Sequence, residues 1–204
     1  MALCQGLGVN LTVAQAVYAD VRARYGENGR YYHTLTHIQR VLQDVDWLYP
    51  DAPPTLHCAA WFHDVVYDPR RHDNEARSAA YATDALAAMG LSSLNGRVAQ
   101  LILCTQTHQP PPEDREAQTL VDADLSILGT AAAVYDQYAA AIRQEYGFVP
   151  EDVYGNGRWR VLQGFAERPC IYHTKPAFHA WEALARANMQ REQAQLAASM
   201  RKTG

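Results

Sequence analysis

The sequence of 204 residues predicts an all-α fold in a single domain that spans residues 1–204. Nearly every periodic segment repeats its apolar residues at intervals of three or four positions, which is the spacing of one helix face. Clusters of glycine and proline separate most of these segments, as expected of turns between helices. The chain shows no convincing pair of strands, no internal repeat and no linker. We therefore expect one helical bundle.

The composition is that of an ordinary globular protein, with 48% hydrophobic and 20% charged residues. Lysine and arginine total 18 against 22 aspartate and glutamate residues, so the net charge of −4 gives no broad nucleic-acid surface. No apolar run is long enough to span a bilayer, and the N-terminal residues lack the features of a secretion signal. The four cysteines are scattered without a C-x-x-C pair, which indicates reduced thiols. We expect a cytoplasmic protein with no membrane partner.

Two helices are expected before Pro50. The first covers residues 12–25, where three valines repeat every four positions, and the glycine-rich segment 26–29 ends it. The second stops at Pro50 and carries an apolar stripe that consists of Ile38, Val41, Leu42, Val45, Leu48 and Tyr49.

A third helix begins at Pro53-Pro54, because proline suits a first helical turn. It is expected to reach Asp68-Pro69, since the residue before a proline avoids the helical region. The apolar run within it leads to His63 and Asp64, an adjacent imidazole and carboxylate.

At helical spacing, mostly apolar residues surround both His63 and Asp64. A buried carboxylate is costly unless a cation meets it, and a divalent metal ion would remove that cost. The alternative is a hydrogen-bonded His-Asp pair at a helix end, which is the simpler interpretation for a lone pair.

Six further helices are expected in the rest of the chain. An acidic start at Asp73 favours the first of them, and Gly90 suits a left-handed stop. Trp181 and Leu184 are expected to anchor the last. The six expected ranges are 73–89, 94–107, 121–128, 130–146, 150–167 and 178–200.

Asp124 is the next candidate metal ligand. Its helical neighbours at three and four positions are all apolar, so a helical Asp124 faces the core, where carboxylates are rare unless paired or metal-bound. Asp122 has mixed neighbours, which suit a helix cap or a hydrogen-bonding partner. His37 lies at the edge of the buried stripe, with His33 four residues earlier on the same face. Histidines at a helix start are usually only surface residues.

Together, His37, His63-Asp64 and Asp124 supply two imidazoles and two carboxylates from three helices. Such a set leaves positions free on the ion, which is typical of a catalytic metal. This H…HD…D order resembles the HD superfamily of metal-dependent phosphohydrolases. Longer blocks between Arg30 and Asn188 are similar to a bacterial branch of predicted HD phosphohydrolases without assigned substrates. These blocks are Arg30-x-Tyr32-His33-x-x-x-His37-Ile38, Trp61-Phe62-His63-Asp64-Val65-Val66-Tyr67, Asn74-Glu75-x-x-Ser78-Ala79, Asp122-Ala123-Asp124-Leu125-Ser126-Ile127-Leu128-Gly129, Arg143-x-Glu145-Tyr146 and Ala185-Arg186-x-Asn188.

The resemblance implies an HD-type helical bundle that binds one divalent ion, whether Mn, Mg, Fe, Co, Ni or Zn, through His37, His63, Asp64 and Asp124. It implies hydrolysis of a phosphate ester of a nucleotide or other small metabolite by a metal-activated water, which Asp64 would orient or deprotonate. Some members bind two ions through two further histidines before the last aspartate. Only His72 and His108 occupy that interval here, and His72 lies in a polar loop, so one ion is expected.

His108 would donate to phosphate or shuttle a proton, unless it is a core-edge histidine bonded to a backbone carbonyl. Glu75 would orient the water or hold a histidine that does not itself bind the ion, although an acidic helix start explains it equally well. Phosphate needs cationic partners, and the expected substrate contacts are His33, Arg30, Arg143, Arg158 and Lys175.

The expected partner is a small phosphorylated metabolite or nucleotide, and a homodimer is compatible with the sequence. Two other functions stay open. One is a metal- and nucleotide-binding module with little turnover, and the other is a diiron oxygenase on an HD-type scaffold.

Overall fold

Helices account for all the regular secondary structure in the computed structural model, which describes residues 9–203 and their side chains through residue 199. The predicted all-α fold is therefore confirmed. In chain order the elements are α2 (Leu11–Tyr25), α3 (Leu35–Leu48), α4 (Pro54–Phe62), α5 (Asn74–Ala88), the 3₁₀ helix η1 (Ser92–Leu94), α6 (Asn95–Cys104), α7 (Arg115–Asp124), the 3₁₀ helix η2 (Leu125–Gly129), α8 (Ala132–Glu145), α9 (Glu151–Ala166) and α10 (Lys175–Thr203). No helix in this part of the chain has the length and apolar character needed to cross a membrane.

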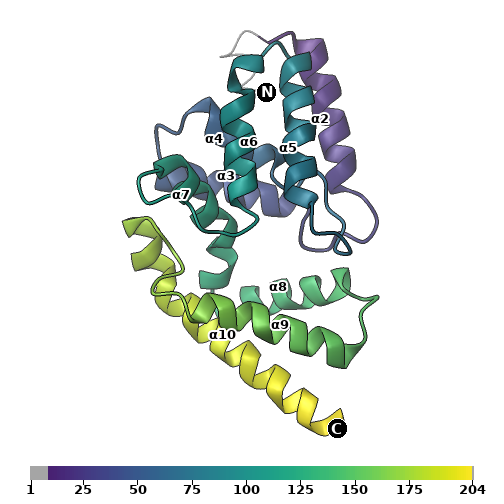
Figure 1. Cartoon of the computed structure of the whole chain (residues 1–204), viewed down its shortest axis with the longest axis vertical. Helices are drawn as coiled ribbons and strands as arrows, with labels where there is room; N and C mark the ends of the chain where they lie inside the picture. The colour runs from purple at the N-terminus through teal and green to yellow at the C-terminus, as the bar shows by residue number, and fades with distance from the viewer. Residues whose placement is uncertain (1–8, 204) are drawn as a thin grey trace.

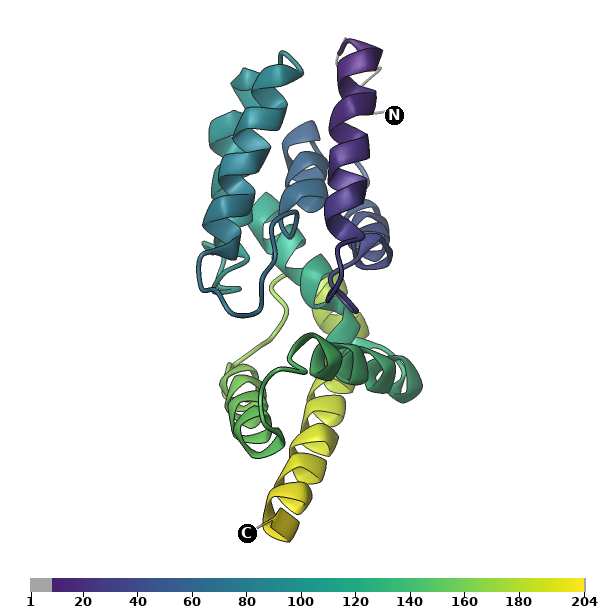
Figure 2. The same ribbon diagram turned by 90° about the vertical axis from the view of Figure 1, so that its right-hand side faces the viewer.

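The helices form two groups joined by α7 and η2. Figure 1 shows α2 to α6 in the upper group and α8, α9 and α10 in the lower group, with α7 leading from one to the other. The side view in Figure 2 keeps this division, and α10 extends away from the upper group. The end of α7 therefore lies at the junction of the two groups.

The main core lies between α3, α4, α6 and α7. Small residues on α4 let its neighbours approach closely, since Ala59 and Ala60 are both fully buried. Larger side chains from α4 itself and from the surrounding helices pack around them, and these include Ile38, Val41, Leu56, Leu101, Ile102 and Leu120, each 0% exposed. This packing fixes the ends of α3, α4 and α7 relative to one another.

The expectation that the third helix reaches Asp68-Pro69 is wrong, because α4 ends at Phe62. Partners distant in sequence satisfy the backbone that leaves the helix. The Arg30 guanidinium donates to the carbonyl oxygens of Asp64 and Val65 at 2.7 and 3.1 Å. The Ser78 hydroxyl bonds the amide and the carbonyl of Val66. With these groups satisfied, the chain can turn six residues before the proline.

Other boundaries also depend on side chains that local periodicity does not reveal. Helix α7 begins at Arg115 rather than 121, because Asp114 caps it by accepting from the Ala117 amide at 3.0 Å. Helix α6 ends at Cys104, earlier than expected, whereas Gly90 has the expected left-handed conformation with φ of 76°.

Of the two residues expected to anchor the last helix, only Trp181 does so. Trp181 packs against the core, but Leu184 is 48% exposed and anchors nothing. The buried stripe of α10 runs through Ala185 and Met189 instead, and Leu184 lies outside it. Helix α10 also starts at Lys175, ahead of the expected residue 178.

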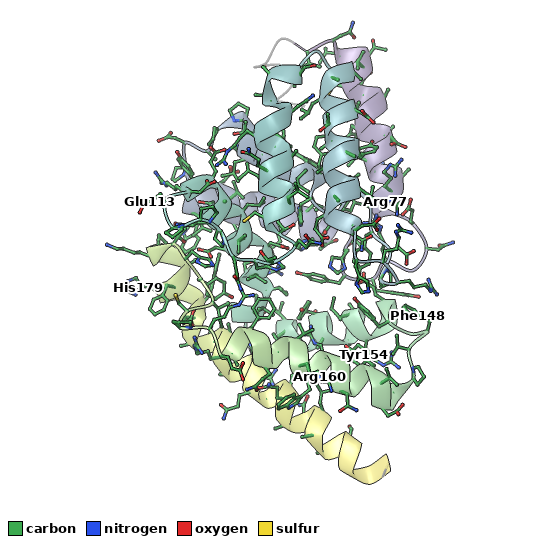
Figure 3. All side chains as sticks on the ribbon, viewed as in Figure 1. Arg77, Glu113, Phe148, Tyr154, Arg160 and His179 are labelled. Carbon is green, nitrogen blue, oxygen red and sulfur yellow. The ribbon has the colours of Figure 1, made fainter. Side chains whose placement is uncertain are left out.

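Side chains from both groups of helices extend into the space between them (Figure 3). Phe148, labelled in Figure 3, lies in the turn between α8 and α9, where the Arg70 guanidinium stands 4.1 Å from the centre of its ring. Arg70 belongs to the loop after α4, so the two groups touch beyond α7 as well.

Candidate metal centre

The four predicted metal ligands reach one point from three helix ends. His37 lies in the first turn of α3, and His63 directly follows α4 with helical backbone angles. Asp64 comes next in the turn, and Asp124 is the last residue of α7. Each of the four offers one ligand atom, and these atoms all lie within 4.8 Å of one another. They form a group that could hold a metal ion.

The spacing of the ligand atoms suits a small cation. His37 Nε2 lies 3.2 Å from His63 Nε2, 3.4 Å from Asp64 Oδ2 and 3.2 Å from Asp124 Oδ1. His63 Nε2 lies 3.1 and 3.5 Å from the same two carboxylate oxygens. Atoms about 2.0–2.2 Å from a shared ion stand about 2.8–3.6 Å apart at adjacent octahedral or tetrahedral angles. The observed separations fall in that range.

The tautomer of His63 also favours a cation. Its Nδ1 lies 2.9 Å from the carbonyl oxygen of Ala60, which can only accept a hydrogen bond, so Nδ1 carries a proton. In the neutral ring, Nε2 then directs a lone pair at two carboxylate oxygens and another imidazole. This backbone contact orients the ring as the outer partners of metal-bound histidines do. The Nδ1 of His37 is buried and has no such partner among the described residues.

The cluster favours positive charge. Burial alone would lower the pKa of His63, but the carboxylates of Asp64 and Asp124 outweigh it and hold that pKa well above its usual value. Burial would raise the pKa of both carboxyls, yet the imidazoles hold them well below their usual range. A divalent cation would supply the same charge in place of protons, so these residues fit a metal.

One side of the cluster is open. The two imidazoles are 1% exposed, whereas the side chains of Asp64 and Asp124 are 17% and 15% exposed. Both carboxylates line a cavity of about 180 Å³. Protein therefore surrounds the histidine side, and the carboxylate side is accessible to a small molecule.

His108 faces this cavity next to Asp124, as expected. Its Nε2 lies 3.0 Å from Asp124 Oδ2, the oxygen that does not contact His37. The sequence leaves open that the ring of His108 bonds a backbone carbonyl instead, but its Nε2 bonds the Asp124 carboxylate. His108 has a positive φ of 50°, and the Arg168 guanidinium donates to the carbonyl oxygens of His108 and Thr107 at 2.8 and 3.0 Å. Such strained backbone is common at functional sites.

His33 lines the cavity too, and Glu145 holds it there. Glu145 Oε2 lies 2.6 Å from His33 Nδ1 and accepts from the Tyr67 hydroxyl at 3.0 Å. Its other oxygen accepts from the backbone amides of Tyr31, Tyr32 and His33. Burial opposes ionisation, but these donors lower the pKa of Glu145 from 4.5 to about 2.

Sequence reasoning did not assign a role to Glu145. A local signal was available, because Glu145 follows Ile142 by three residues and Tyr138 by seven on α8, which places it on the inward face. The block Arg143-x-Glu145-Tyr146 also contains it.

Of the four predicted cationic substrate contacts, the structure brings Arg158 to the cavity. Arg30 is buried, and its guanidinium is bonded mainly to backbone carbonyls. Arg143 pairs with Glu151 at 2.9 Å and holds the turn after α8. Lys175 is exposed at the start of α10. These last three expectations therefore need correction, because Arg30, Arg143 and Lys175 are outside the cavity lining.

Glu75 does line the cavity, at the start of α5. Asp122, expected to be a cap or a hydrogen-bonding partner, is a hydrogen-bonding partner of the segment just before α10. It is fully buried and accepts from the amides of His173 and Thr174 at 2.8 and 2.7 Å. Burial raises the pKa of Asp122 to about 6, while the two amides oppose that rise.

Comparison with known proteins assigns no family. No protein-family model matches the chain, and searches of curated proteins and of solved structures give no significant match. A function for this chain is therefore inferred from the chemistry of the four-residue cluster and its cavity.

Proposed function

We propose that this protein is a metal-dependent phosphohydrolase of the HD type that acts on a small phosphate ester. The observation that carries the proposal is the asymmetry of the cluster, in which two imidazoles are buried and two carboxylates face a cavity. The H…HD…D order of the four residues supports the HD resemblance. An open side beside a metal is what separates catalytic from structural sites.

A divalent ion held by His37, His63, Asp64 and Asp124 would lower the pKa of a water and polarise a phosphoryl oxygen. Hydrolysis forms a bond from the water oxygen to phosphorus and breaks the ester P–O bond. The water must lose a proton, and the leaving oxygen must gain one. Asp64 is the proposed acceptor, because its carboxylate is partly open to the cavity.

His33 is the proposed donor to the leaving oxygen. It lines the cavity, and Glu145 fixes its ring through Nδ1, which leaves Nε2 for the substrate. His108 donates to Asp124 and keeps a second imidazole beside the phosphate position. Glu75 lines the same space and helps to orient the water.

The other two functions predict different chemistry. A diiron oxygenase needs a second set of ligands, and no second group of three or more metal-ligating atoms this close occurs among the residues the structure describes. This favours the hydrolase with one ion. A binding module would hold the ligand without turnover, and only an assay separates it from an enzyme.

The test is phosphate release from a panel of phosphate monoesters by the full chain with Mn²⁺. We expect turnover that chelator abolishes and that His63→Ala lowers at least a hundredfold. His57→Ala is the matched control, because His57 lies on α4, which His63 directly follows, but pairs with Asp46 outside the cavity. It should stay within twofold of wild type. Wild-type activity in His63→Ala would show that the turnover comes from elsewhere, and oxygen uptake with Fe²⁺ without phosphate release would favour the oxygenase.

A further inference from the structure

We propose that the cavity selects a phosphate monoester whose organic group is compact and apolar, such as one small ring, and disfavours polyphosphates. The phosphate part of this inference rests on the proposed function. The apolar selectivity follows from the lining of the cavity itself.

The wall of the cavity that α9, η2 and α8 supply is mostly hydrocarbon, with Arg158 and Tyr138 as its polar members. Helix α9 turns one stripe of residues into it, since Arg158, Val161, Leu162 and Phe165 all line it at spacings of three and four. Residues of η2 and α8 complete this wall, among them Leu125, Leu128 and Ile142. A hydroxyl or charged group of a substrate that packs against Val161, Leu162 or Phe165 would lose its water without a polar partner there, which costs free energy. A ring or short hydrocarbon gains by the same burial.

The size of the cavity restricts the organic group further. Its volume is about 180 Å³, below the roughly 300–1,000 Å³ of pockets that enclose drug-sized ligands. Once a phosphate stands beside Asp64 and Asp124, little room is left for more than one ring. A nucleoside exceeds this space, which narrows the expected substrates to smaller esters.

The charges of the lining disfavour more than one phosphate. Asp64, Asp124 and Glu75 are carboxylates, and Arg158 is the one arginine or lysine among the described residues of the lining. Its guanidinium already donates to both carboxylate oxygens of Glu192 at 2.8 and 3.1 Å. A diphosphate or triphosphate would therefore bring extra negative charge to a lining without a spare arginine or lysine.

The first test measures binding by calorimetry, with the full chain loaded with Mn²⁺ and ligands that cannot be hydrolysed. The ligands are phenylphosphonate, methylphosphonate and methylenediphosphonate. We expect phenylphosphonate to bind at least tenfold more tightly than either of the others. Equal binding of phenylphosphonate and methylphosphonate, or tighter binding of the diphosphonate, would overturn the inference.

A matched pair of variants tests the charge argument. Val161 and Val153 both lie on α9 and are 52% and 56% exposed, so a lysine at either position can reach water without unfolding the helix. Val161 lines the cavity and Val153 does not. Val161→Lys should shift the ratio of affinities toward methylenediphosphonate by at least tenfold, and Val153→Lys should leave the ratio unchanged. The same ratio in both variants would contradict the proposed placement of the substrate.

These outcomes separate the two proposals. A preference for phenylphosphonate in a protein that hydrolyses no phosphate ester would reject the proposed function and keep the apolar selectivity. Hydrolysis of esters by a protein without this preference would keep the function and reject the inference.

Discussion

At the scale of single residues, two aspartates only two positions apart on α7 have different partners. Asp124 faces the two imidazoles and the cavity, whereas Asp122 points away and accepts from two backbone amides just before α10. Helical geometry requires this, since side chains two residues apart point about 200° from one another.

Replacing each aspartate by asparagine should therefore give opposite results. Asp124→Asn removes a charged ligand, so Mn²⁺ affinity should fall by at least a hundredfold. Asp122→Asn leaves the metal affinity within threefold but lowers the free energy of unfolding by about 1–3 kcal/mol, because one of two buried amides loses its acceptor. Calorimetric titration and urea unfolding measure the two effects. Tight Mn²⁺ binding by Asp124→Asn together with lost binding by Asp122→Asn would reverse the assignment.

Glu145 predicts a pH dependence of stability. Its pKa is about 2 in the folded protein against 4.5 as a reference, so its contribution is fully present above the unfolded value and is lost as the pH falls through the folded value. Glu145→Gln should lower the free energy of unfolding by an amount on the order of 3 kcal/mol at pH 7. The difference from wild type should shrink between pH 4.5 and pH 2. Urea unfolding across this range checks it, and a difference independent of pH would speak against the buried carboxylate network.

The four residues of the candidate metal centre could be predicted from the sequence because burial and ligand chemistry coincide in them. His63, Asp64 and Asp124 are polar residues in apolar surroundings, and local periodicity shows this. The roles of Arg30 and Glu145 could not be found in the same way. Their partners are backbone groups of other segments, and Glu145 bonds amides that precede it by more than 110 residues.

At the scale of elements, η2 and α10 position Asp124. The short helix η2 directly follows Asp124 in the chain, and α10 packs against η2. The Asn188 side chain donates to the carbonyls of Leu128 and Thr130 at 2.9 and 2.8 Å, and the Tyr172 hydroxyl donates to the Leu125 carbonyl at 2.9 Å. The late block that contains Asn188 thus has a structural role far from the cluster in sequence.

Gly129 allows the close approach of η2 to α10. A Cβ at this position would meet the Cβ of Trp181 and stand 2.8 Å from its Cα, so the backbone would have to shift. Gly129→Ala should lower the free energy of unfolding by about 1–3 kcal/mol or more and weaken Mn²⁺ binding, because Asp124 moves with η2.

Gly157→Ala is the control for that variant. Gly157 lies within α9, and a Cβ there meets nothing within 4 Å. The substitution should raise the free energy of unfolding by about 0.5–1 kcal/mol, because alanine favours a helix. Thermal unfolding of both variants with and without Mn²⁺ measures these effects. A Gly129→Ala protein as stable as wild type would show that η2 and α10 are not held as tightly as described.

Element boundaries were harder to predict than the elements themselves. The sequence places every long helix, because apolar periodicity persists over several turns. The ends of α4 and the start of α7 depend on Arg30, Ser78 and Asp114, which satisfy or cap backbone groups. Local sequence patterns do not reveal contacts between segments that are far apart in the chain.

At the scale of the whole molecule, the cavity lies where the two groups of helices meet. The upper group and the end of α7 supply the four candidate metal ligands, whereas α8, α9 and η2 supply the apolar wall. A bound ion links α3, the end of α4 and α7, so it should stabilise the fold as well as the site.

Removing the ion should therefore lower the melting temperature. At a Mn²⁺ concentration about 100 times its dissociation constant, binding adds about 2.7 kcal/mol of stability, which corresponds to about 5–10 °C for a chain of this size. Chelator should remove this increase. Asp124→Asn should show the same melting temperature with and without Mn²⁺. A wild-type melting temperature that does not change with Mn²⁺ would argue against a metal site at this junction.

The most direct test of the metal centre is an anomalous difference map from crystals of the full chain loaded with Mn²⁺. We predict one strong peak per chain, about 2.0–2.3 Å from His37 Nε2, His63 Nε2, Asp64 Oδ2 and Asp124 Oδ1. A map with no peak at this point, or with a second peak of equal height beside His108, would contradict a single ion held by these four residues.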